Sequence, residues 1–150
     1  MKPELIFVPM LVLVFWTFVI VSWLAYKRFS AAFAGRVKAG WFKVGESEKV
    51  PDDVRVVGRN FVNLFEMPVL FYTVCISSYV VHQVPAALVV LAWCYAVLRI
   101  VHSLIHITYN HVNQRFMVYF GSCLLLLAMW IVFAVNLHQA PSVTLSWPFH

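Results

Sequence analysis

The sequence predicts an all-α membrane protein, a bundle of four transmembrane helices in up-and-down order. Composition is the first observation: 63% of the 150 residues are hydrophobic and 11% are charged, against about 25% charged in an average soluble protein. The second observation is that the apolar residues gather in four runs of about 20 residues, the length that crosses a bilayer as a helix. Polar segments separate the runs, so consecutive helices alternate in direction, and we expect one domain.

The first half of the chain holds two of these spans. Residues 5–26 are uncharged, and Pro9 lies in the first turns, where a helix tolerates proline. A polar loop follows. Pro51 and the two acidic residues after it are typical of a helix start, because acids are favourable in a first turn. We therefore expect a second helix from Pro51, with its membrane span at residues 57–81.

The second half holds the other two spans. A very short connection leads into the third span, which we place at residues 85–106. A loop rich in Asn and His follows, and the fourth span is expected at residues 116–137. The tail, residues 138–150, contains two prolines and no helical period, so we expect it to be extended or docked on a neighbouring element.

Basic residues indicate how the bundle is oriented. Loops on the cytoplasmic side of a membrane carry an excess of Lys and Arg. The third loop ends at Arg115, the second loop and the tail have no Lys or Arg, and the first loop is the most basic segment. Its basic residues are Lys27, Arg28, Arg36, Lys38, Lys43, Lys49 and Arg55. We expect loops one and three in the cytoplasm and both termini on the opposite side.

Composition also argues against two classes of function. The net charge of +5 sits at membrane edges and forms no soluble basic domain, so nucleic acid is a poor partner. The three cysteines, Cys75, Cys94 and Cys123, lie inside apolar runs, where cysteine acts as a small hydrophobe. No Cys/His spacing resembles a zinc site, and we expect no metal.

A polar stripe on the second helix predicts a functional site. Arg59, Asn63 and Glu66 are spaced i, i+4 and i+7, so they share one face of a helix that is otherwise apolar. Ionisable residues within a membrane span are expensive in lipid. They normally face the interior of the bundle and mark a site.

The third helix carries a matching stripe. Arg99, His102 and His106 are spaced i, i+3 and i+7. Counted from the connection between the two helices, Glu66 and Arg99 differ in depth by only about 3 Å. Since an unpaired Arg or Glu at this depth costs about 2.5–3.5 kcal/mol or more, we expect Glu66 and Arg99 to form an ion pair.

The polar residues allow two interpretations. A few of them would serve as a lock between helices. Six, with Arg115 just beyond, exceed what a lock needs and favour a site for an anionic, zwitterionic or peptide-like ligand. Other chemistries fit less well. Haem needs two His on facing helices, a di-iron site needs more carboxylates than Glu66 alone, and no Ser/His/Asp arrangement is visible.

These residues resemble a pattern of the MAPEG family, the membrane-associated proteins in eicosanoid and glutathione metabolism. The second helix has R-x-x-x-N-x-x-E followed closely by Pro68, the third has R-x-x-H, and an arginine begins the fourth. The likeness extends from the first-loop segment 35–38 to the start of the fourth span. Their order and placement on four spans make the resemblance more specific than any one motif.

The resemblance implies a homotrimer of four-helix protomers, with the second helix nearest the threefold axis. It also implies glutathione, bound between protomers at the cytoplasmic side. The residues that would hold the tripeptide are Arg59, Asn63, Glu66, Arg99, His102 and His106. Arg115 would be the catalytic residue that stabilises the thiolate, reaching into this pocket from a neighbouring protomer.

Two functions of different classes follow. The first is an enzyme that conjugates glutathione to a lipophilic electrophile, or reduces a peroxide with it. The second is a non-catalytic membrane protein: a scaffold, a lipid-binding protein or an accessory subunit of a larger complex. The missing family tyrosine and the aromatic tail at residues 147–150 favour the second, whereas Arg115 with the intact face of Arg59, Asn63 and Glu66 favours the first. The chain departs from the family pattern near these residues. His106 stands where several members have Tyr, Tyr109 is three residues further on, and Phe116 follows Arg115 without a hydroxyl.

Overall fold

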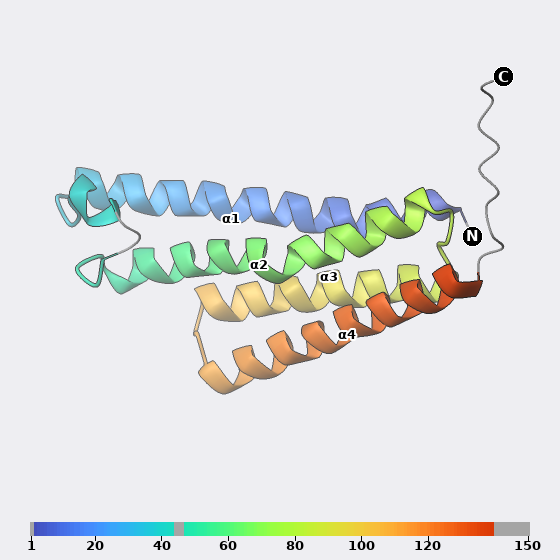
Figure 1. Ribbon diagram of the computed structural model, residues 1–150. Helices are drawn as coiled ribbons and strands as arrows, with labels where there is room; N and C mark the ends of the chain where they lie inside the picture. Colours follow the sequence, from blue (N-terminus) through green and yellow to red (C-terminus); the bar gives the residue numbers. More distant parts are fainter. Residues whose placement is uncertain (1, 44–46, 140–150) are drawn as a thin grey trace, which may run out of the picture.

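The computed structural model describes residues 2–43 and 47–139, and every regular element in that part of the chain is helical. Four long helices are each apolar and long enough to cross a membrane (Figure 1). The elements in order are the 3₁₀ turn η1 (Pro3–Ile6), α1 (Phe7–Phe33), the 3₁₀ turn η2 (Ala39–Phe42), α2 (Asp52–Val80), α3 (Ala86–Ile107) and α4 (Val112–Gln139).

The four helices run up and down, as the sequence predicts. Helix α1 packs along α2 and α3, and α4 packs mainly on α3 with a smaller contact to α2. The α1–α2 loop and the α3–α4 turn lie at one end of the bundle, and the α2–α3 turn lies at the other (Figure 1). We call the first of these the loop end. The α1–α2 loop extends beyond the α3–α4 turn (Figure 1), so the finish of α3 lies beside a part of α2 about two turns from its start, where Asn60 donates to Ser103.

Helix α1 is longer than the predicted span. It continues past residue 26 to Phe33, so Lys27 and Arg28 lie on the helix and not in a loop. The helix stops at Gly35, which has a φ of 67°, a conformation that glycine adopts without strain. The N–H of Gly35 donates to the carbonyl of Ala32, and the next N–H donates to the carbonyl of Ala31. This Schellman pairing satisfies the last carbonyls and ends the helix.

Two other boundaries bear on the site. Helix α2 starts at Asp52, directly after Pro51. Helix α4 starts at Val112, four residues before the predicted span, which places Arg115 in its first turn. The predicted tail, residues 138–150, lies outside the described residues from position 140 onward.

Helix α2 changes direction in the middle of its length (Figure 1). Pro68 lies inside the helix. It has no N–H for the carbonyl of Leu64, and its ring crowds that carbonyl, which is a usual cause of a kink. Around this bend the bundle has its main core, in which Phe71 of α2 stacks on Tyr95 of α3 with ring centroids 4.5 Å apart.

The loop end has a small core of its own. Its buried members are Ala31, Val37, Val50 and Val54, with Trp41 and Phe42 packed against them. Beside it, Asp53 accepts two hydrogen bonds from Arg36, at 2.9 and 3.0 Å, and one from Lys27 at 3.4 Å. The α1–α2 loop is therefore folded onto the two helices that it joins.

Candidate functional site

The arginine in the middle of α3 is fully buried, and it bonds to α2. Arg99 has no exposed surface. Its Nη2 donates to the main-chain oxygen of Asn63 at 2.7 Å and to the side-chain oxygen of Asn63 at 2.6 Å. Both acceptors lie in the turns that precede Pro68. Arg99 thus joins α3 to α2 next to the bend.

Asn63 stands between Arg99 and Glu66, so the predicted ion pair is wrong. Because the Asn63 Oδ1 faces a guanidinium, which only donates, its Nδ2 must face the other way. There it donates to Glu66 Oε2 at 3.2 Å. Among the described residues, Arg99 forms no ion pair. Glu66 and Arg99 were placed at one level by counting residues, which gives the level of each Cα along its helix. The long Arg99 side chain instead reaches Asn63, one turn nearer to the loop end.

The two histidines of α3 are buried next to Arg99. His102 and His106 lie with ring centroids 5.9 Å apart. Tyr119 of α4 covers this group from the other side. Its ring centroid is 5.6 Å from that of His102 and 5.4 Å from the guanidinium carbon of Arg99. The contact with Arg99 is within the range of a cation–π interaction.

Arg115 enters the same region from the first turn of α4. Its Nη1 donates to Asn110 Oδ1 at 2.7 Å and lies 3.3 Å from His106 Nε2. Asn110 is in the α3–α4 turn, with a φ of 48°, a left-handed conformation that asparagine tolerates. The turn therefore holds the guanidinium over the end of α3.

Two cavities meet at these residues. The smaller, of about 260 Å³, is lined by Asn63, His102, His106, Val112, Arg115, Phe116 and Tyr119. The larger, of about 610 Å³, lies between α1 and α2 and is lined by Arg59, Asn63, Glu66 and His106 together with Arg28, Phe42 and apolar residues. Asn63 and His106 line both cavities. We call the pair of cavities the polar site.

The structure brings six of the seven predicted site residues to the walls of the polar site. Arg59 and Glu66 line the larger cavity, His102 and Arg115 line the smaller one, and Asn63 belongs to both. Arg99 lines neither cavity and acts on the site through Asn63. Arg115 lines the smaller cavity of its own chain.

Tyr119 is a site residue that sequence reasoning missed. The resemblance directed attention to a tyrosine one turn after His102, where this chain has His106, and to Tyr109. Tyr109 is exposed outside both cavities, whereas Tyr119 lines the smaller one. The signal was present, since Tyr119 lies four residues after Arg115 and therefore on the same face of a helix that starts early enough to contain both.

The charges of the polar site fit an anionic or zwitterionic ligand. Arg28, Arg59 and Arg115 present three cations, and the buried Arg99 adds a fourth behind Asn63. Glu66 is the one carboxylate among the residues that line the two cavities. A hydrogen bond between a guanidinium and a carboxylate is stronger than a hydrogen bond between two neutral groups, which suits arginine to the binding of carboxylates.

Comparison with known proteins agrees with this arrangement. The sequence model of the MAPEG family matches residues 6–135, which include all of α1, α2 and α3 and all of α4 except its last four residues. No curated protein and no solved structure match the chain.

The hydrogen bonds of Asn63 give a first prediction. Removing the Asn63 amide takes a bond from a buried charge, which is worth about 1.5–3 kcal/mol. Glu66 contacts Arg99 only through that amide. We therefore expect Asn63→Leu to lower the free energy of unfolding by about 2 kcal/mol, and the matched variant Glu66→Gln to lower it by less than about 1 kcal/mol. Titration with a denaturing detergent, followed by circular dichroism, measures both. Equal losses of unfolding free energy in the two variants would contradict this account and would favour a direct ion pair between Glu66 and Arg99.

Proposed function

Because the chain belongs to the MAPEG family, we propose that it binds glutathione in the polar site and transfers it to a lipophilic electrophile, or uses it to reduce a lipophilic peroxide. The protein is a multi-pass membrane protein with four helices that can span the bilayer. The observation that carries the proposal is the meeting of two cavities at Asn63 and His106, with cations and a carboxylate on their walls. Glutathione offers the complementary groups: two carboxylates, one ammonium and a thiol.

The two cavities suggest how the tripeptide would be divided. The larger cavity has Arg59 for a carboxylate and Glu66 for the ammonium group. The smaller cavity has Arg115 and the two histidines, which suits the thiol. Asn63, fixed by Arg99, would bond to the peptide between them. Its Oδ1 is already used by Arg99, so the contact would come from the Nδ2 that now donates to Glu66.

Arg115 would serve the chemistry by stabilising the thiolate. A nearby guanidinium lowers the pKa of a thiol, and the thiolate is the nucleophile. Its sulfur would attack an electrophilic carbon to form a carbon–sulfur bond, and the displaced electron pair would leave with the leaving group or with a conjugated acceptor that then takes a proton. With a peroxide as substrate, two glutathione molecules would be oxidised to the disulfide as the peroxide is reduced.

A homotrimer would complete the site. Arg59 and Glu66 are exposed on the single chain although they belong to a membrane-spanning helix. Charged groups at that depth avoid lipid. A neighbouring protomer packed against α2 would cover them and would bring α2 nearest to the threefold axis. In the same arrangement, the α1–α2 and α3–α4 loops would face the cytoplasm, as their basic residues favour.

A second candidate function has one observation in its favour. The Nη1 of Arg115 is already held by Asn110 and lies beside His106, so the guanidinium is occupied within the chain. An arginine held in this way would also suit a helix anchor in a non-catalytic protein, either a scaffold or lipid-binding protein or an accessory subunit of a membrane complex.

Calorimetry with glutathione tests the proposed function. The purified protein should bind the tripeptide, and Arg59→Gln should weaken binding about tenfold or more, since a charged hydrogen bond is lost. The matched control is Arg55→Gln, one turn earlier on α2. Arg55 bonds to Asp52 and lines neither cavity, so binding should change by less than about threefold. Absence of any glutathione binding would favour the non-catalytic function.

The role of Arg115 gives a separate prediction. Bound thiol should ionise below its usual pKa of about 8.5, and its ultraviolet absorbance reports the thiolate. Arg115→Leu should abolish this absorbance at neutral pH while leaving affinity within about tenfold, because other residues hold the ends of the ligand. Gln114→Leu, an exposed neighbour, serves as the control. Thiolate that persists in Arg115→Leu would assign the residue to anchoring the helix.

The oligomeric state can be tested by disulfide crosslinking. We expect native mass measurement in detergent to give a trimer. With the native cysteines replaced, Val69→Cys on the exposed face of α2 should crosslink between protomers, because α2 lies nearest the axis. Leu127→Cys on the exposed face of α4 should not. A mass of monomer or dimer alone, or crosslinking only at position 127, would refute the arrangement.

A further inference from the structure

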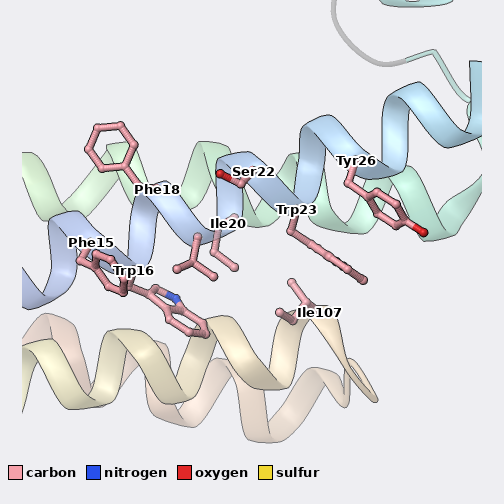
Figure 2. Close-up of a pocket in the computed structure, with 9 residues that line it drawn as sticks. Phe15, Trp16, Phe18, Ile20, Ser22, Trp23, Tyr26 and Ile107 are labelled. Atoms are coloured by element: carbon pink, nitrogen blue, oxygen red, sulfur yellow. The ribbon is translucent and has the colours of Figure 1, made fainter.

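An apolar groove runs along α1 on a face that does not belong to the polar site. It has a volume of about 550 Å³, and it is lined by Phe15, Trp16, Phe18, Val19, Ile20, Ser22, Trp23, Tyr26 and Ile107. Trp16, Ile20 and Trp23 point from α1 toward α3, and Ile107 reaches up from the end of α3 toward Trp23 (Figure 2). Phe15 and Tyr26 are more than half exposed, so the groove is open along its length.

The length of the groove matches one leaflet of a membrane. From Phe15 to Tyr26 the helix rises about 17 Å, and half of the hydrocarbon core of a bilayer measures about 15 Å. The groove begins near the middle of the membrane-spanning helix and ends at the loop end of the bundle. It therefore has the extent of one acyl chain that starts at the membrane surface.

Apart from the indole nitrogen of Trp16, the polar side chains that line the groove lie where it meets the surface. Ser22, Trp23 and Tyr26 line that part, and Trp and Tyr are the residues that lie at the level of lipid head groups. Trp23 and Tyr26 stack with ring centroids 5.4 Å apart. The Nζ of Lys27 lies 5.5 Å from the Trp23 ring centroid, so a cation lies beside the aromatic wall of the groove at its surface end, although Lys27 does not itself line the cavity.

The Lys27 ammonium group can donate further hydrogen bonds beyond its contact with Asp53. Its contact with Asp53 is long, at 3.4 Å, and Asp53 accepts two shorter bonds from Arg36. An ammonium group has three donors, and more than a quarter of the Lys27 side chain is exposed. The segment from residue 27 to residue 55 has seven basic and four acidic residues, a net charge of +3. The surface end of the groove thus complements an anion.

We propose that this groove is a binding site for an anionic phospholipid of the leaflet at the loop end, with an acyl chain between Trp16, Val19 and Ile107 and the phosphate on Lys27. The length of the groove, its apolar walls and the cation at one end all fit one such molecule. The proposal does not depend on glutathione binding.

Fluorescence quenching by brominated lipids tests the site in the full-length protein. The protein is reconstituted in phosphatidylcholine vesicles that contain a minor fraction of either brominated phosphatidylglycerol or brominated phosphatidylcholine with the same chains. The signal of Trp23 is the difference between the wild type and Trp23→Phe. We expect phosphatidylglycerol to quench Trp23 as if it were enriched about fivefold, the size expected for one basic residue near anionic lipid.

Three variants separate the site from a diffuse attraction. Lys27→Met should remove the preference for phosphatidylglycerol. Lys38→Met should keep it, because Lys38 is an exposed cation of the α1–α2 loop without the contact to Trp23 that Lys27 has. Asp53→Asn removes the ion pair but keeps the ammonium, so the preference should remain or increase. Circular dichroism confirms that each variant is folded.

Several results would overturn the proposal. Equal quenching by the two lipids would show that the groove has no preference for an anion. An equal loss in Lys27→Met and Lys38→Met would show that the attraction is spread over the loop. A loss in Asp53→Asn as large as in Lys27→Met would trace the effect to the ion pair. Quenching by neither lipid would show that a second copy of the chain covers the groove.

Discussion

A buried guanidinium in a membrane helix must find its hydrogen-bond partners within the protein, and the site depends on the part of that requirement that Asn63 meets. Arg99 has no exposed surface, and it spends one nitrogen on two oxygens of Asn63. The turn that supplies these acceptors is followed by Pro68, where α2 bends (Figure 1). Because Arg99 fixes the direction of the Asn63 amide, it also determines that the remaining donor faces Glu66.

The other polar groups lie at the loop end because the two connections there bring them into contact. The finish of α3 and the start of α4 are joined by a short turn, so His106, Asn110 and Arg115 come into contact. The α1–α2 loop packs onto its own small core, and Asp53 ties it to Lys27 and Arg36. One end of the bundle thereby carries the cations, while the opposite half is almost wholly apolar. In the function proposed above, this separation would let a charged co-substrate and a lipophilic substrate reach the site from different phases.

The α1 helix separates two kinds of surface. Leu24 and Arg28 line the larger polar cavity on one side, whereas Ile20, Trp23 and Tyr26 line the apolar groove on another (Figure 2). Lipid in the groove would contact the side of α1 opposite to any ligand in the polar site. A helix of this kind can hold a cofactor and a structural lipid at once without competition between them. The extension of α1 to Phe33 places Lys27 and Arg28 on the helix, and it therefore makes both contacts possible.

The sequence by itself determined the four helices, their up-and-down order, the MAPEG family and the polar faces of α2 and α3. A helix needs about 20 apolar residues to cross the bilayer, so the apolar runs indicate the four spans. A helix repeats every 3.6 residues, so polar residues spaced i, i+4 lie on one face, which must avoid lipid. Only the tertiary structure decided that Arg99 bonds to Asn63 and not to Glu66, that α4 begins early enough to turn Arg115 and Tyr119 into the smaller cavity, and that Lys27 stands beside Trp23. Counting residues locates a Cα along its own helix. The reach of a long side chain, the bend at a proline and the contact between helices depend on packing in three dimensions.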